Sequence, residues 1–284
     1  MSRHLAALLG LIPMLLLPGL AQAQPLTDVV PRDLYTDTMR QDGNSITFCY
    51  NRNGMTAAFD QELAEAIGSV LLVEAKTVPL RSNGVPTTPL DYRLPYTAQQ
   101  LFVLIAEECD AIIGYVLSRN APEWVRLTRP YLSTGSVLVV RDPAIQRLED
   151  LPLDQSIGSR SMSTADNRLA SYLRSLPEAR RWVRRPYYSN ERVLEKLNDG
   201  STGAGLVWEP ALYFATDGDP QAAGYYQLPL PFQERRTELA IATRSSNTYL
   251  NSILGEAIEE LIADGTLAEM IDRHHLGPTS LPQQ

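Results

Sequence analysis

Segments of β type and α type alternate along this chain, and this alternation constrains the fold more than any other feature. In chain order the segments are SITFCY at 45–50, AAFDQELAEAIGSVL at 57–71, LLVEAKTVPL at 71–80, TAQQLFVLIAEE at 97–108 and CDAIIGYV at 109–116. Strands that alternate with helices predict a parallel sheet with right-handed crossovers. Ligands of such sheets bind at the carboxyl ends of the strands. We therefore expect the loops at Asn51 and Gly114 to belong to a binding site.

A second unit of the same kind follows. GSVLVV at 135–140, SIGSRS at 156–161, GAGLVWE at 203–209 and ELAIAT at 238–243 read as strands. TADNRLASYLRSL at 164–176 reads as a helix with Thr164 as its N-cap, and NERVLEKLNDG at 190–200 as a helix that ends at Gly200. A long amphipathic region at 247–274 is interrupted by Gly265, which predicts two helices joined by a turn.

The first 23 residues have the pattern of a secretory signal. Arg3 and His4 precede an apolar run at 5–20, and an Ala-Gln-Ala site at 21–23 follows. The run is short for a membrane-spanning helix, which needs about 20 apolar residues. We expect cleavage after Ala23, export to the periplasm, and a mature chain that is not inserted in the membrane. Residues 24–40 read as an irregular N-terminal arm.

Composition narrows the functional classes. Charged residues make up 20% of the chain and hydrophobic residues 44%, which is typical of a globular protein. A net charge of −8 argues against nucleic acid as a partner. Cys49 and Cys109 are the only cysteines, too few with the three histidines for a usual zinc site, and we expect no metal or cofactor.

Export favours a disulfide between Cys49 and Cys109. Cys49 lies late in its expected strand, whereas Cys109 opens its own. In register, parallel strands would separate the two by about 13 Å, so the bridge requires staggered or bent strands. Two buried thiols are the alternative.

Several segments together resemble family 3 periplasmic solute-binding proteins. They are AFDQELAEAI, CDAIIGYV, RPYLSTGSVLVVR, LEDLPLDQSIGSRSMSTADNRLASYL and the C-terminal NTYLNSILGEAIEELIADGTLAEMIDRHHLG. The resemblance covers residues 45–277. It implies the type II fold: two α/β lobes, each a mostly parallel sheet flanked by helices, joined by a two-strand hinge. Lobe 1 would be 41–133 with 239–277, lobe 2 would be 134–238, and 278–284 would be a tail.

The resemblance also implies site residues in lobe 1. Amino-acid binders of the family grip the ligand carboxylate with a Thr-x-x-Arg segment. Counted back from the Pro-Tyr pair at 130–131, Ser118 takes the threonine position and Ala121 the arginine position. Alanine cannot make the bidentate contact of arginine. Arg119 is a candidate substitute grip, although a solvated surface arginine is equally compatible with its position. Ser118 and Arg119 therefore join Asn51 and Gly114 as candidate ligand-binding residues.

In lobe 2 the resemblance points to three more residues. Met162, Ser163 and Thr164 stand where family members often read Gly-Thr-Thr at a helix start, so Ser163 and Thr164 are candidate anion ligands. N-capping by Thr164 is the alternative. Glu209 follows a buried strand, where amino-acid binders place an acidic residue against the ligand amine. Its alternative is a solvated loop position.

VWEPALYFA at 207–215 and the placement of the two cysteines resemble a narrower group. This group is the J-type accessory proteins of periplasmic methanol dehydrogenases that use the quinone cofactor PQQ. The proline-rich insertion at 79–96 and a longer loop after Gly114 depart from that pattern.

Three functions follow as hypotheses. The first is a monomeric, non-enzymatic binding protein for a small-molecule ligand, serving ABC-type uptake through a membrane permease and not specific for ordinary α-amino acids. The alternative is an accessory protein of a PQQ-dependent dehydrogenase. The weaker alternative is an enzyme derived from a binding protein, against which the sequence shows no nucleophile–base constellation.

Overall fold

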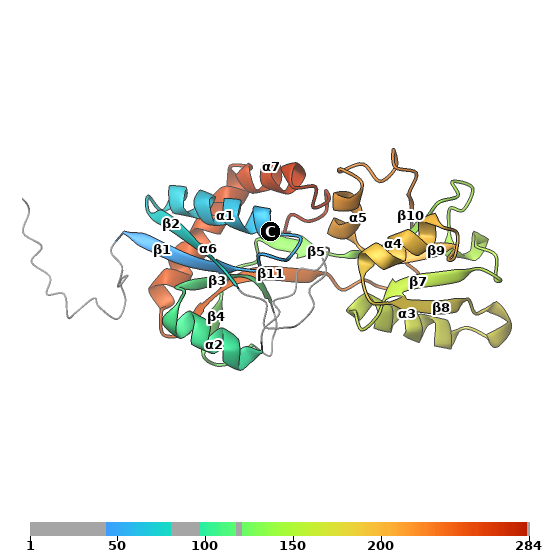
Figure 1. The fold of residues 1–284 in the computed structure, drawn as a ribbon, viewed down its shortest axis with the longest axis horizontal. Coiled ribbons are helices and arrows are strands. Elements are labelled where there is room, and N and C mark those ends of the chain that lie inside the picture. Colours follow the sequence, from blue (N-terminus) through green and yellow to red (C-terminus); the bar gives the residue numbers. More distant parts are fainter. Residues whose placement is uncertain (1–43, 81–96, 118–120, 283–284) are drawn as a thin grey trace, which may run out of the picture.

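The computed structural model describes residues 44–80, 97–117 and 121–282. They form two α/β lobes that lie side by side along the long axis of the molecule (Figure 1). Each lobe has a mixed β-sheet flanked by helices, which is the fold expected from the sequence. The expected signal at 1–23, the expected N-terminal arm at 24–40 and most of the proline-rich insertion lie outside the described residues. In the described part of the chain, no helix is long and apolar enough to cross a membrane.

The sheet of lobe 1 has the strand order β2-β1-β3-β11-β4, and β5 pairs with β11. Its strands are β1 (Ser45–Tyr50), β2 (Glu74–Pro79), β3 (Ala111–Val116), β4 (Val125–Leu127), β5 (Leu132–Thr134) and β11 (Thr237–Arg244). The helices α1 (Ala57–Val70), α6 (Thr248–Ala263) and α7 (Thr266–Arg273) share one buried cluster with the sheet, and α2 (Ala98–Glu107) shares another. Helices therefore cover both faces of this sheet.

The sheet of lobe 2 has the order β10-β6-β9-β7-β8. Its strands are β6 (Ser136–Val140), β7 (Ser156–Arg160), β8 (Val183–Tyr187), β9 (Ala204–Trp208) and β10 (Tyr226–Leu228). The helix α3 (Thr164–Ser175) packs on one face, and α4 (Asn190–Asn198) and α5 (Glu209–Ala215) pack on the other. In the described part of lobe 2, two 3₁₀ turns lie between these elements, η2 (Leu148–Asp150) and η3 (Glu178–Arg180).

The chain crosses between the lobes twice. It leaves lobe 1 where β5 runs into β6, and it returns where residues 229–236 lead into β11. Because β11 enters lobe 1 from the side of lobe 2, it runs antiparallel to β3, whereas β1 pairs in parallel with both β2 and β3. The sheet is consequently mixed, with its parallel pairs among β2, β1 and β3.

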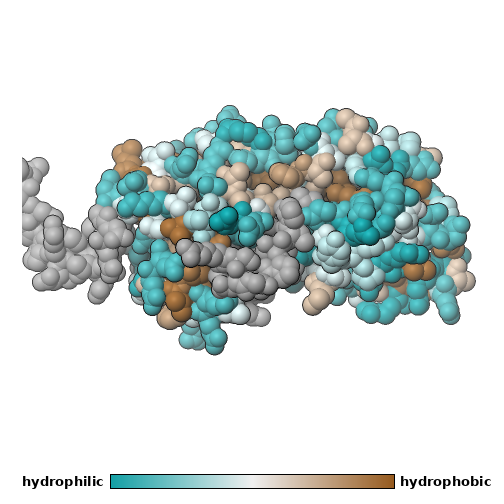
Figure 2. Space-filling model, viewed as in Figure 1, coloured by the Kyte–Doolittle hydropathy of each residue, from teal (hydrophilic) through white to brown (hydrophobic). Residues whose placement is uncertain are grey.

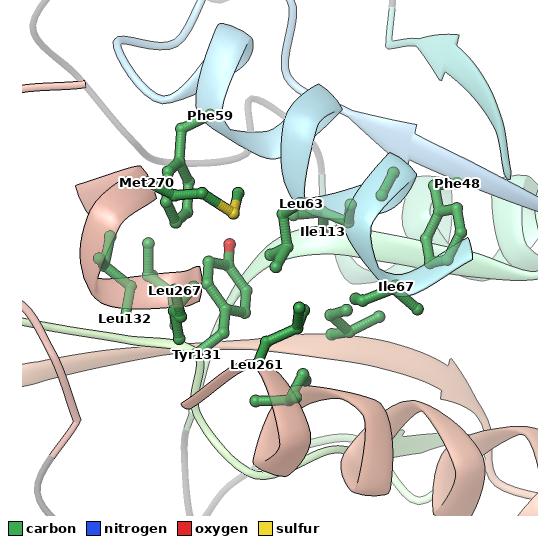
Figure 3. Close-up of a cluster of buried hydrophobic side chains, with 14 of the residues drawn as sticks. Phe48, Phe59, Leu63, Ile67, Ile113, Tyr131, Leu132, Leu261, Leu267 and Met270 are labelled. Carbon is green, nitrogen blue, oxygen red and sulfur yellow. The ribbon is translucent and has the colours of Figure 1, made fainter. Parts of the chain in front are cut away.

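The core of lobe 1 holds a buried polar group among apolar side chains. Tyr131 is buried and stacks on Phe59 with ring centroids 6.0 Å apart (Figure 3). Its hydroxyl lies 3.5 Å from the Asp60 carboxylate, which also accepts a hydrogen bond of 3.0 Å from the Thr56 hydroxyl. Burial raises the pKa of Asp60 to about 7, and the two hydroxyls oppose the rise.

Cys49 and Cys109 form a disulfide with a Cα–Cα distance of 5.8 Å. In the parallel register Cys49 lies opposite Ile112, so Cys109 is three residues before the residue that pairs with Cys49. The bridge forms because β3 begins only at Ala111, and Cys109 belongs to the turn after α2, where its N–H donates to the Leu104 carbonyl. The sequence interpretation that placed Cys109 in the strand was wrong. The bend before the strand, which the sequence analysis gave as one condition for the bridge, is observed.

Candidate functional site

A pocket of about 160 Å³ lies at the junction of lobe 2 with the two crossings. Six parts of the chain line it: the β5–β6 crossing at 134–136, the end of β7 at Arg160, the start of α3, Asn190 at the start of α4, the end of β9, and the returning segment 229–236 with Thr237 of β11. The start of α3 and the end of β9 both follow strand carboxyl ends, where ligands of α/β sheets bind. Hydrophobic residues gather along the junction of the two lobes, while most of the visible surface is hydrophilic (Figure 2). The pocket therefore lies where the chain passes between the two lobes.

Positive charge dominates the pocket. Arg160 from β7, Arg168 from α3 and Arg235 from the returning segment line it, and Glu234 is the one acidic residue among its lining. The Glu234 carboxylate accepts a hydrogen bond from the N–H of Ser136, so the acid is held against the crossing. Arg168 donates to the Gln233 carbonyl, which fixes its guanidinium beside the returning segment.

Ser163 and Thr164, both predicted from the sequence, line this pocket. Ser163, not Thr164, is the N-cap of α3, since its hydroxyl accepts from the Asp166 N–H at 3.0 Å. Thr164 is the first helical residue and is exposed. The sequence interpretation placed the cap one residue too late, because both residue types are good N-caps. The Thr164 hydroxyl is therefore not used as the cap of this helix.

Met162 forms the rim of the pocket in an unusual backbone conformation. Its φ is 62°, in the left-handed region that favours glycine, and its side chain is 85% exposed. The Met162 N–H donates to the buried carboxylate of Asp166 at 3.2 Å. Asp166 also accepts from the Ser159 hydroxyl at 2.6 Å and pairs with Arg184. This network holds the turn that presents Met162 at the mouth of the pocket.

The predicted lobe 1 residues are placed differently. Neither Asn51 nor Gly114, the two that the structure describes, lines the pocket. Asn51 is buried, and its side-chain oxygen accepts from the Asn53 N–H in the turn after β1. Gly114 has a φ of 88° at a bulge where β3 pairs with β11. Ser118 and Arg119 lie outside the described residues. A ligand-binding role of these four residues stays a prediction.

Glu209 is buried at the start of α5, with an exposed fraction of 4%. Its carboxylate accepts from the Thr279 hydroxyl and lies 3.7 Å from the Arg236 guanidinium. Burial raises the pKa of Glu209, opposed by the hydrogen bond from Thr279 and the charge of Arg236. The solvated position considered for it is wrong. Glu209 does not line the pocket, and its role in ligand binding stays untested.

Arg236 ties the same region together from the hinge. Its guanidinium donates to the Ser133 carbonyl and to the Thr279 carbonyl, both at 2.6 Å. Ser133 belongs to β5, and Thr279 to the C-terminal segment that follows α7. Lobe 1, the returning segment and α5 of lobe 2 thus meet at one cluster of charged and polar groups.

The sequence interpretation missed the arginines of the pocket. Arg235 stands in a stretch without a helix or strand pattern, and Arg168 reads as an ordinary charged helix position. Only the return of the chain at 229–237 brings Arg235 to the start of α3. Of the two histidines that the structure describes, neither lines the pocket.

No family model matches the chain. A curated relative is the Bacillus subtilis (strain 168) protein named "Probable amino-acid-binding protein YxeM". It is 23% identical over 244 residues, which cover 82% of this chain and 81% of that protein.

Similar solved structures include an ancestral cationic amino acid solute-binding protein, with a TM-score of 0.63 and 17% identity, covering 82% of this chain and 96% of that one. The open form of substrate-binding domain 2 of Lactococcus lactis GlnP has a TM-score of 0.63 at 15% identity, covering 84% and 98%. The unliganded, open L-cystine solute receptor of Neisseria gonorrhoeae has a TM-score of 0.61 at 18% identity, covering 84% and 95%. The chain has the two-lobed α/β fold of type II periplasmic binding proteins. The relatives named here are binding proteins.

Proposed function

We propose that this chain is an exported solute-binding protein that closes on a small molecule between its lobes and delivers it to an ABC-type permease. The observation that carries the proposal is the pocket at the junction of lobe 2 with two chain crossings. A ligand in that position can touch both lobes only when they close, so the closed state gains its contacts only with ligand present. The binding proteins of similar fold support this function.

We further propose that ordinary α-amino acids are not its ligands. Ala121 stands in the position where the family resemblance puts a carboxylate-gripping arginine. Loss of a hydrogen-bonded charge pair costs about 2–5 kcal/mol, which is tens- to thousands-fold in affinity. Titration calorimetry across the common amino acids tests this, and we expect no sub-micromolar dissociation constant.

Closure is tested separately by small-angle X-ray scattering. A ligand found in a thermal-shift screen should reduce the radius of gyration, since the lobes approach. Ligands that stabilise the protein without any compaction would contradict the closing mechanism. The accessory role with a PQQ-dependent dehydrogenase stays the second hypothesis. Co-purification with such a dehydrogenase, in the absence of any small-molecule ligand, would favour it over transport.

A further inference from the structure

We infer that the pocket takes a small organic carboxylate that has an apolar body and lacks a free ammonium group. The inference rests on the proposed function and names the ligand class of the same site.

The charge of the pocket points to an anion. Arg160, Arg168 and Arg235 face a single carboxylate, that of Glu234, so the lining carries a formal surplus of two positive charges (three minus one). The chain as a whole has a net charge of −8. A positive hollow in an acidic protein concentrates anions locally. The guanidinium is also the group best suited to pair with a carboxylate in two parallel hydrogen bonds.

Arg235 is the cation best placed to make that contact. It is exposed, and within the described ranges its guanidinium has no hydrogen bond or ion pair. Arg168, in contrast, is committed in part to the Gln233 carbonyl. Glu234 is committed to the Ser136 N–H, so it offers less to a ligand ammonium than a free carboxylate would. The available charge of the pocket is therefore cationic.

Part of the pocket lining is apolar. Trp208 at the end of β9 and Phe232 of the returning segment line it, and Met162 stands at the rim. An exposed methionine in a left-handed conformation is costly, by about 1–3 kcal/mol, and such residues cluster at ligand-binding sites. Its flexible thioether chain adapts to apolar ligands of different shape. An anion with a hydrocarbon body would match both the cationic and the apolar residues of the lining, whereas inorganic phosphate or sulfate would match only the cationic ones.

The test uses pairs of probes that differ only in the ammonium group. We would measure binding of 4-methylpentanoate against L-leucine and of 3-phenylpropanoate against L-phenylalanine, with inorganic phosphate and sulfate as bare anions. Calorimetry on the full mature chain should show each carboxylate binding at least about tenfold more tightly than its amino acid and than either inorganic anion. The affinity should fall as salt is added.

Two charge-matched variants locate the contact. Arg235→Gln should weaken carboxylate binding by roughly tenfold or more. Arg185→Gln removes the same charge from the same lobe, at an exposed position of β8 outside the pocket, and should leave the affinity within about twofold. Equal effects of the two substitutions would overturn the assignment, since the charge would then act only through the overall field.

Other outcomes separate this inference from the proposed function. If an amino acid, a cation or a neutral solute binds more tightly than the carboxylates and compacts the protein in scattering, the binding function stands and the anion inference is wrong. If phosphate or sulfate binds best, the apolar body is wrong. If no probe and no solute of a broad metabolite library binds or compacts the protein, the proposed function and the inference both fail.

Discussion

At the scale of single residues, Asp60 makes the stability of the protein depend on pH. Its pKa is about 7 in the folded protein against 3.8 in a free side chain, so the folded state binds more protons between these values. The contribution of Asp60 to the free energy of unfolding is therefore greatest below about pH 4. It falls as pH rises to about 7, with a slope of at most about 1.4 kcal/mol per pH unit.

We expect Asp60→Asn to remove this slope, whatever its effect on overall stability. Urea unfolding of both proteins from pH 4 to 8 measures it, and the difference in unfolding free energy should change steadily until about pH 7. Asp154→Asn, at an exposed position, is the control and should keep the wild-type slope. An unchanged slope in Asp60→Asn would show that the Asp60 carboxyl titrates normally.

Thr279 is expected to stabilise the buried carboxylate of Glu209. Thr279→Val removes the hydroxyl that donates to it, and loss of a hydrogen bond to a buried carboxylate costs about 1–3 kcal/mol, while the Arg236 ion pair remains. Thr279→Ser keeps the hydroxyl and should lose much less. Urea unfolding of the two variants decides, and a larger loss in Thr279→Ser than in Thr279→Val would show that Thr279 acts through its methyl group.

At the scale of elements, the bulge of β3 depends on Gly114. Gly114→Ala places a side chain at a φ of 88° and should destabilise the protein by about 1–2 kcal/mol. Gly255→Ala is the matched control within lobe 1, because it lies inside α6 with open space where the methyl group would go. It should stabilise by up to about 1 kcal/mol. Thermal unfolding of both variants measures the difference between them. A Gly114→Ala variant as stable as the wild type would contradict the prediction.

The disulfide of lobe 1 should be fully formed and stabilising. Thiol titration of the denatured, unreduced protein should find no free thiol. Replacing both cysteines by alanine removes a cross-link between residues 60 positions apart and should cost about 4 kcal/mol by the loop-entropy relation. Two titratable thiols per chain would contradict the bridge.

The longer elements were predictable from sequence, and the shorter ones were not. α1 and α6 have a hydrophobic periodicity over many residues, and β9 is a continuous apolar run. β8 was missed because Val-Arg-Arg-Pro-Tyr forms an exposed edge strand, and its charged residues and proline do not give the apolar pattern that predicts a strand. α5 was missed since its seven residues carry too little periodicity.

At the scale of the whole molecule, the two-lobed fold was predictable because several segments agree with one architecture. The pocket was only partly predictable. Ser163 and Thr164 follow from the start of a helix after a strand, which is a local pattern. Arg235 and Glu234 join them through the second crossing, and no local pattern specifies where a returning segment lies relative to α3.

The antiparallel pairing of β11 with β3 has a consequence for biosynthesis. Lobe 2 is made from one continuous stretch of chain, whereas lobe 1 lacks β11, α6 and α7 until the last residues emerge. Lobe 1 therefore begins to be synthesised first but is completed last. The edge of β3 stays unpaired until β11, more than a hundred residues downstream, is made. A nascent or prematurely terminated chain would expose that edge, together with the apolar face meant for α6. Such a chain is a target for chaperones and proteases rather than a shorter folded form of the protein.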